Sequence, residues 1–265
     1  MSISRQVPVV SWEQGDTSSR SDEVAAEAPI ALTYNKRAHV VMMATPTNLE
    51  DFATGFSLTE GIINQPADLL DATLIGRDKG LELAISVTQE CFGRLDEQRR
   101  NLVGRTGCGL CGAESLEQAI HKPAAVGSKV STSHAGLQAA IQSLNDHQPL
   151  QAATGALHGA AWCSTDGKIL AVREDVGRHN ALDKLIGHLA RSEFDPGSGF
   201  VLVSSRASYE MVYKAAAVGI EILLAVSAPT ALAIDFANRS GISLVGFARP
   251  GRHNIYTFEG RIHDD

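Results

Sequence analysis

Short apolar runs in the first third of the chain predict a small α+β unit. Residues 1–25 are polar, rich in Ser, Asp and Glu, and predict a flexible N-terminal arm outside the fold. Residues 30–45 form two strand-like runs around a polar turn, which is typical of a hairpin. Apolar residues at helical spacing over 48–60 predict a helix, and Thr47 followed three residues later by Glu50 has the spacing of a capping box.

Two further strand-like runs, ATLIG and LELAISV, complete this first unit. The residues that follow, 91–107, are too polar and too rich in glycine for a buried element. We therefore expect a smaller N-terminal α+β subdomain over residues 26–125, ending in a loop that carries two cysteines.

The pattern changes after Pro123. A helix is predicted near 134–146, followed by two strand-like runs around an Asp166-Gly167 turn. Short β-branched runs then alternate with amphipathic helices, which is typical of parallel strands joined by right-handed crossover helices. The expected fold class is α/β, with a layered C-terminal domain over residues 126–265 built on a mostly parallel sheet.

Four segments of this domain are expected to meet at one edge of the sheet. In an open parallel sheet, the loops that run from strands into helices emerge at the same edge, where ligands bind. These segments are REDVGRHN (173–180), SSRAS (204–208), SAPT (227–230) and FARPGR (247–252). The edge predicts a site for a phosphate-bearing or nucleotide ligand, because helix N-termini bind anions and guanidinium groups form paired bonds to phosphate. The arginines are Arg178, Arg206, Arg249 and Arg252.

Each of these segments also has a purely structural interpretation. The serines and threonines are common helix caps, and the arginines alone would form a solvated rim. Asn180 with Asp183 has the spacing of a helix start, and His179 fits a hydrogen-bonded structural histidine, so we assign no reaction to either.

Composition excludes several classes of protein. The chain has 265 residues, with 23 basic and 30 acidic side chains and a net charge of −7, which disfavours binding to nucleic acid or to anionic membranes. No apolar run has the length of a signal peptide or of a membrane span, so we expect a cytoplasmic protein. The 4 cysteines lack the spacing of a disulfide framework, and a reducing compartment leaves them as thiols.

Cys108 and Cys111 form a CxxC motif in GCGLCG, which has three interpretations. A structural zinc site needs four ligands, and His121 or His134 would have to help complete it. A thioredoxin-like dithiol needs a preceding central strand, which the polar segment before the motif does not predict. The third interpretation is persulfide chemistry, because Arg105 and the start of the helix-like AESLEQAI both favour the reactive thiolate.

The motifs GCGLCG, REDVGRHNALDK, RASYEMVYKAA, SAPTALAIDFA and LVGFARPGRHNIYT, in this order, closely resemble the formate dehydrogenase accessory sulfurtransferase family, FdhD. The match runs from about Ile30 to the C-terminus. The resemblance implies a cytidine-deaminase-like C-terminal domain. It also implies a sulfurtransferase that takes persulfide sulfur from a cysteine desulfurase and passes it to the molybdenum or tungsten bis(guanine dinucleotide) cofactor of formate dehydrogenase.

By that resemblance, Cys108 carries the persulfide and Cys111 is its partner in relay. The cofactor-binding segment is matched by Phe247, Ala248, Arg249, Pro250, Gly251 and Arg252, next to the Arg206 that the sheet edge supplies. The cofactor is a bound substrate that a GDP-like nucleotide would mimic, and no resident metal is assigned. A cofactor with two nucleotide arms makes a homodimer an attractive hypothesis.

Departures from the family and two competing functions complete the interpretation. Ser205 stands where the family usually has glycine, at a cost of about 1 kcal/mol or more if that position needs positive φ. Ala156 replaces a second common glycine, so His158 is left without a role. A zinc deaminase would need H-x-E with a downstream P-C-x-x-C, which this chain lacks. The stronger alternative is a non-catalytic cofactor-binding chaperone whose CxxC holds structural zinc.

Overall fold

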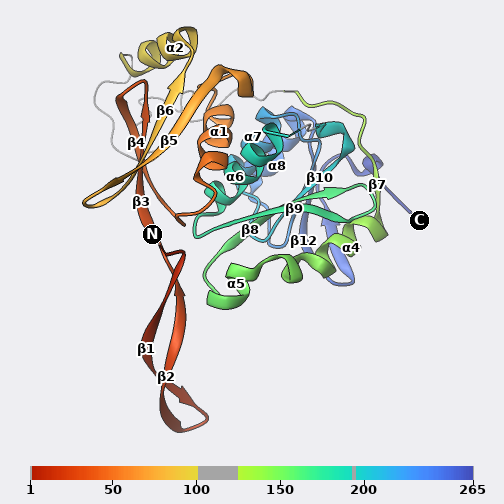
Figure 1. Cartoon of the computed structure of the whole chain (residues 1–265). Helices are drawn as coiled ribbons and strands as arrows, with labels where there is room; N and C mark the ends of the chain where they lie inside the picture. Colours follow the sequence, from red (N-terminus) through yellow and green to blue (C-terminus); the bar gives the residue numbers. More distant parts are fainter. Residues whose placement is uncertain (1, 101–124, 193–194, 265) are drawn as a thin grey trace.

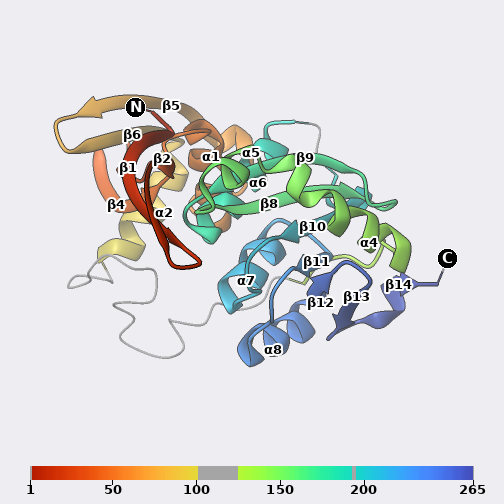
Figure 2. The ribbon, with the colours of Figure 1, turned by 90° about the horizontal axis from the view of Figure 1, so that it is seen from below.

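The computed structural model describes residues 2–100, 125–192 and 195–264, which form two α/β units lying side by side (Figures 1 and 2). The C-terminal unit is built on a six-stranded sheet of order β13-β12-β11-β10-β8-β9. Its strands are β8 (His158–Ser164), β9 (Ile169–Asp175), β10 (Gly199–Val203), β11 (Ile222–Ala225), β12 (Ser243–Arg249) and β13 (Arg252–Ile255). Strands β10, β11 and β12 are parallel, and β9 runs in their direction because two antiparallel pairings, through β8, separate it from β10.

Helices cover both faces of this sheet, and the alternation of side chains along each strand explains why. In β10, Val201 and Val203 pack against α6 (Arg178–Ala190), α7 (Tyr209–Ala217) and α8 (Ala231–Ser240). Phe200 and Leu202 of the same strand pack on the opposite face against α4 (His134–Ser143). Both faces of the central strands are therefore buried, which is why these strands are continuously apolar.

Short elements complete the C-terminal unit. They are the 3-10 turns η2 (Leu144–His147), η3 (Pro196–Ser198) and η4 (Glu259–Arg261), the helix α5 (Pro149–Thr154), and the paired strands β7 (Thr132–Ser133) and β14 (Ile262–His263). The expected helix near 134–146 is confirmed as α4 continued by η2, and the Asp166-Gly167 turn joins β8 to β9.

The N-terminal unit is a four-stranded sheet of order β4-β3-β6-β5 with α1 (Leu49–Thr59) packed on it. The strands are β3 (Ala28–Tyr34), β4 (Arg37–Ala44), β5 (Leu69–Arg77) and β6 (Gly80–Val87), and η1 (Pro66–Asp68) precedes β5. Ile30, Leu32 and Leu83 of the sheet and Phe52 of α1 are completely buried together. The expected α/β fold class with a smaller N-terminal α+β unit is confirmed.

Two local expectations in this unit are wrong. Helix α1 begins after Asn48, whose side chain accepts no capping hydrogen bond, and Glu50 forms an ion pair with Arg191 rather than a capping box with Thr47. The residues from Gln89 form the helix α2 (Gln89–Arg100). Cys91 and Leu95 lie one turn apart on that helix and are buried against the N-terminal core, so a narrow apolar stripe is enough to hold a polar helix.

The expectation of a flexible arm over residues 1–25 is also wrong. β1 (Ser4–Glu13) and β2 (Asp16–Ala25) pair along their whole length as an antiparallel hairpin that extends away from the body of the molecule (Figure 1). Gln14 and Gly15 both have positive φ, as a two-residue hairpin turn requires. The hairpin lacks a buried apolar face, since Val10 and Trp12 are each 71% exposed, and its sequence therefore resembles a polar arm.

Helices α1 and α6 cross in close contact and join the two units. Gly55 of α1 lies against the backbone of Asp183, and Gly187 of α6 lies against the backbone of Asp51. A β-carbon at either glycine would overlap a carbonyl oxygen of the other helix. Two glycines, spaced to face one another, therefore set the distance between the helices. In the described part of the chain, no helix has both the length and the apolar character needed to span a bilayer.

We expect Gly55→Ala to destabilise the protein by about 1–3 kcal/mol or more, because the added methyl group meets backbone atoms that move only if the whole helix moves. Gly93→Ala in α2 is the matched control, since a β-carbon there meets open space. That variant should be neutral or more stable by up to about 1 kcal/mol. Urea unfolding of both variants checks this, and equal midpoints would show that the crossing is not tightly packed.

Candidate functional site

The loops after β10, β11 and β12 meet at one edge of the sheet and are joined by backbone hydrogen bonds. The amide of Val226 donates to the carbonyl of Val203 (2.9 Å), and the amide of Ser227 donates to that of Ser205 (3.2 Å). The amide of Phe247 donates in turn to the carbonyl of Ser227 (3.1 Å). The predicted convergence of these segments is confirmed.

The fourth segment reaches the same edge through β8. The amide of Ser204 donates to the carbonyl of Gly159 (2.9 Å), and the amide of Gly159 donates to the side chain of Ser204 (2.9 Å). His158 is opposite Asp175 in the pairing of β8 with β9, so it lies where β9 ends and residues 173–180 begin. The edge therefore includes His158, for which the sequence motifs predict no role.

Residues Phe247–Arg252 form the tip of a hairpin between β12 and β13 rather than a loop that leads into a helix. The pairing register shifts between Gly246 and Arg249, which marks a bulge, and Phe247 within it has φ 51. Gly251 has φ +81, which explains the glycine, and Arg249 pairs directly with Arg252.

The bulge places Phe247 outward, 41% exposed, whereas Ala248 is buried. Arg206, Arg249 and Arg252 are exposed as well, and among the described residues none of the three forms an ion pair. The edge thus presents guanidinium groups with no acidic partner in the described parts of the chain.

The helices that begin at this edge are capped differently. Thr230 accepts a hydrogen bond from the amide of Ala233 (3.3 Å), as expected of a cap. Ser208 precedes α7 without capping it, and its hydroxyl is buried with no partner among the described residues. Ser205 does not have positive φ and donates to the carbonyl of Arg206 (3.0 Å), so the predicted backbone cost of serine does not arise.

His179 joins the first turns of α6 and α7, because its Nε2 lies 2.7 Å from Oε2 of Glu210. The hydrogen bond from His179 is the main reason that the pKa of Glu210 lies below its usual value. Burial lowers the pKa of His158, and the charges of Arg178 and His179 act in the same direction. His158 is therefore a neutral imidazole at neutral pH.

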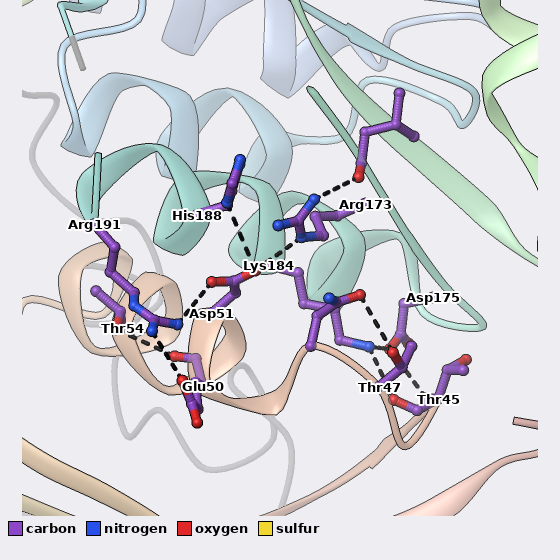
Figure 3. Close-up of polar contacts among 12 residues, drawn as sticks. Thr45, Thr47, Glu50, Asp51, Thr54, Arg173, Asp175, Lys184, His188 and Arg191 are labelled. Atoms are coloured by element: carbon purple, nitrogen blue, oxygen red, sulfur yellow. Dashed lines mark hydrogen bonds and ion pairs between the residues drawn. The ribbon is translucent and has the colours of Figure 1, made fainter. Parts of the chain in front are cut away.

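The rest of the segment REDVGRHNALDK is structural. Asp175 accepts hydrogen bonds from Lys184 (2.6 Å), from Asn180 (3.0 Å) and from the backbone amide of Thr45 (3.0 Å), as Figure 3 shows in part. Asn180 does not start the helix, which begins at Arg178. Its amide group also donates to the carbonyl of Met43 (2.8 Å).

Two further networks join the same helices. Arg173 and Arg191 hold the carboxylate of Asp51 at 2.8 and 3.0 Å, beside His188 (Figure 3). Lys214 contacts Asp183 (2.9 Å), and also Glu60 and Thr59 at 2.7 and 3.0 Å.

The energetics of this second network follow from its burial. Burial raises the pKa of Asp183. Burial alone would lower the pKa of Lys214, but the charges of Asp183 and Glu60 outweigh it and raise that pKa above its ordinary value. Lys214 therefore stays charged inside the protein, and its two carboxylates hold α1, α6 and α7 together.

Cys108, Cys111 and His121 lie outside the described residues. Cys163 is fully buried in β8, and burial raises the pKa of its thiol. His134 contacts His253, and the described residues contain no group of three or more side chains able to hold a metal ion. A separate pocket of about 310 Å³ lies at the start of α1, lined by residues 46–51 of the N-terminal unit together with Arg191 of the C-terminal unit.

Comparison with known proteins defines the class. The model of the FdhD/NarQ family matches residues 25–263, and the chain therefore belongs to that family, as its motifs predict. The sulfur carrier protein FdhD of Cupriavidus necator is 52% identical over 254 residues, which cover 96% of this chain and 88% of the relative. The sulfur carrier protein FdhD of Bordetella petrii is 47% identical over 244 residues, covering 92% and 88%.

One solved structure has the same fold. It is the crystal structure of a proposed formate dehydrogenase accessory protein from Desulfotalea psychrophila, with a TM-score of 0.76 and 24% identity. The match covers 98% of this chain and 100% of the other. The arrangement of the two units is thus shared at low sequence identity.

We expect Lys184→Met to destabilise the protein by about 3–5 kcal/mol, because it leaves the buried carboxylate of Asp175 without its cation. Arg191→Met removes an arginine that is nearly half exposed, so it should cost no more than about 1 kcal/mol. Thermal and denaturant unfolding compare the two variants. Similar losses of stability in both variants would show that the buried Lys184–Asp175 pair matters no more than the partly exposed Arg191.

Proposed function

We propose that this protein is a sulfur carrier that accepts persulfide sulfur from a cysteine desulfurase and transfers it to the molybdenum or tungsten bis(guanine dinucleotide) cofactor needed by formate dehydrogenase. Membership of the FdhD/NarQ family is the observation that carries the proposal, since relatives near 50% identity bear the name sulfur carrier protein. The proposal that the protein binds this cofactor rests on the residues at the edge of the C-terminal sheet. The identity of both partners, the homodimer and the cytoplasmic location stay predictions.

The sheet edge supports a phosphate-bearing substrate. Arg206, Arg249 and Arg252 are exposed there, without carboxylate partners in the described parts of the chain, and a guanidinium group binds phosphate through paired charge-assisted bonds. Phe247 keeps a backbone conformation that bulky residues rarely adopt, and it presents its ring to solvent beside these arginines. Such strain concentrates at functional positions, and an exposed ring is suited to stacking on a nucleobase.

The sulfur chemistry rests on Cys108 and Cys111. The Cys108 thiolate attacks the terminal sulfur of the donor persulfide, so that a new S–S bond forms while the donor S–S bond breaks and the donor cysteine leaves as a thiolate. Attack of the Cys111 thiolate on that terminal sulfur relays it and returns Cys108 to a thiolate. Release as sulfide needs two electrons, which the two thiols supply by forming a Cys108–Cys111 disulfide.

We expect GDP to bind, and Arg249→Ala or Arg252→Ala to weaken binding by about 1.5–3 kcal/mol, because each variant loses a charge-assisted hydrogen bond. Added salt should weaken binding to the wild type as well. Arg239→Ala is the control, because this exposed arginine lies near the C-terminal end of α8, away from the edge. Calorimetry measures the affinity of the wild type and of all three variants for GDP. Equal affinity in the two edge variants and the wild type would remove these arginines from the site.

For the cysteines, we expect Cys108→Ala to accept no sulfur from a desulfurase supplied with cysteine and to fail in activating formate dehydrogenase. Cys111→Ala should be loaded but impaired in transfer. Intact-mass measurement detects the added sulfur atom on each variant. The zinc-holding chaperone predicts a different outcome, with loss of bound metal and of stability in both variants alike. Sulfur on Cys108→Ala within residues 108–111, with activation retained, would show that Cys108 is not the carrier.

A further inference from the structure

The side chain of Gln138, on helix α4, contacts the tip of the hairpin formed by β12 and β13. The backbone amide of Gly251 donates to Oε1 of Gln138 (2.7 Å), and Nε2 of Gln138 lies 3.0 Å from Nδ1 of His253. One side chain is therefore bonded both to the turn and to the strand that follows it. The hairpin otherwise ends in a two-residue turn next to a bulge, and Pro250 and Gly251 of that turn are exposed.

These contacts have a fixed direction. Because Oε1 of Gln138 accepts from Gly251, its Nε2 donates to His253, whose Nδ1 must be an unprotonated acceptor. His253 then carries its proton on Nε2, which lies 2.8 Å from Nδ1 of His134. The two imidazole rings stack with centroids 5.0 Å apart, and Nε2 of His134 faces the carboxylate of Asp264 at 4.0 Å. This series of hydrogen bonds is consistent only with a neutral His253.

We propose that Gln138 is a positioning residue that holds the Gly251 turn, and with it Arg249 and Arg252, in the orientation that receives the phosphate-bearing substrate. The two arginines are cross-strand neighbours on either side of the turn, so a turn held by α4 fixes the backbone from which both guanidinium groups extend. This hold, by which we mean the two hydrogen bonds that join Gln138 to Gly251 and to His253, involves only the hairpin and α4. Its consequence for ligand binding rests on the proposed function.

The hold depends on pH through His253. Burial lowers the pKa of His253, and the charge of His134 acts in the same direction. The groups that face this ring are His134 and Gln138 of α4 and, beyond His134, the carboxylate of Asp264, while Arg252 precedes it on its own strand. Both bonds of Gln138 are therefore intact above the ordinary imidazole pKa of about 6.5, and the bond to His253 is lost as the pH falls from that value through the lowered pKa of His253.

Hydrogen exchange of the peptide amides over residues 248–254, measured on the full chain without nucleotide, tests the hold directly. Gln138→Leu should speed exchange there by about 5-fold to 10-fold, since the amide of Gly251 loses a hydrogen bond of ordinary strength. Gln142→Leu is the control, because Gln142 is exposed one turn further along α4. Gln138→Glu keeps an acceptor for the amide of Gly251 and should exchange as the wild type does at neutral pH.

The pH profile separates positioning from a merely structural role. In the wild type, the exchange rate of the hairpin amides relative to their intrinsic rate at each pH should rise as the pH falls below about 6.5. Gln138→Glu should suppress that rise, because its carboxylate favours a protonated His253. At neutral pH, Gln138→Leu should bind GDP about 5-fold to 10-fold more weakly than Gln142→Leu does.

Exchange in Gln138→Leu that matches Gln142→Leu would overturn the proposal, and so would faster exchange with unchanged affinity for GDP. If the wild type itself fails to bind GDP, the ligand assigned under the proposed function is wrong. The exchange data alone then show whether Gln138 restrains the Gly251 turn.

Discussion

The buried ion pair between Lys184 and Asp175 is the interaction on which the rest of the structure depends. Both side chains are 0% exposed, and Lys184 also donates to the carbonyl of Thr45. Asp175 ends strand β9 at the edge of the sheet where His158 lies, whereas Thr45 belongs to the N-terminal unit. The pair therefore fixes the two units relative to one another and fixes the start of α6. Burial disfavours the charge on Lys184 and lowers its pKa, but the adjacent carboxylate opposes that shift.

The topology of the C-terminal sheet was predictable because it follows from local patterns. Alternating apolar strands and amphipathic helices indicate parallel strands, and parallel strands place SSRAS, SAPT and FARPGR at one edge. The partners of the buried charges were not predictable in this way. Asp175 and Thr45 are 130 residues apart, and no periodicity links them. REDVGRHNALDK therefore resembled a ligand-binding loop, although most of its polar side chains join the two units.

The structure also differs from the sequence-based expectations where a local sequence pattern is misleading. The hairpin β1–β2 lacks a buried apolar face, so its sequence shows no alternation between core-facing and solvent-facing residues. Ser208 has the sequence of a helix cap, yet its hydroxyl makes no capping bond. The contribution of α4 to the edge had no signal, since Gln138 is an ordinary glutamine in an amphipathic helix. Site geometry in this protein thus comes from tertiary contacts, while the residue types at the site are visible in the sequence.

We propose that the edge formed by the loops after β10, β11 and β12 binds the guanine nucleotide arm of the cofactor. Photocrosslinking with an azido-guanosine diphosphate, followed by mapping of the labelled peptides, tests it most directly. We expect label within residues 204–208, 227–230 or 247–252, and competition by unmodified GDP. Competable label confined to the pocket at residues 46–51, or to the hairpin over residues 4–25, would contradict it.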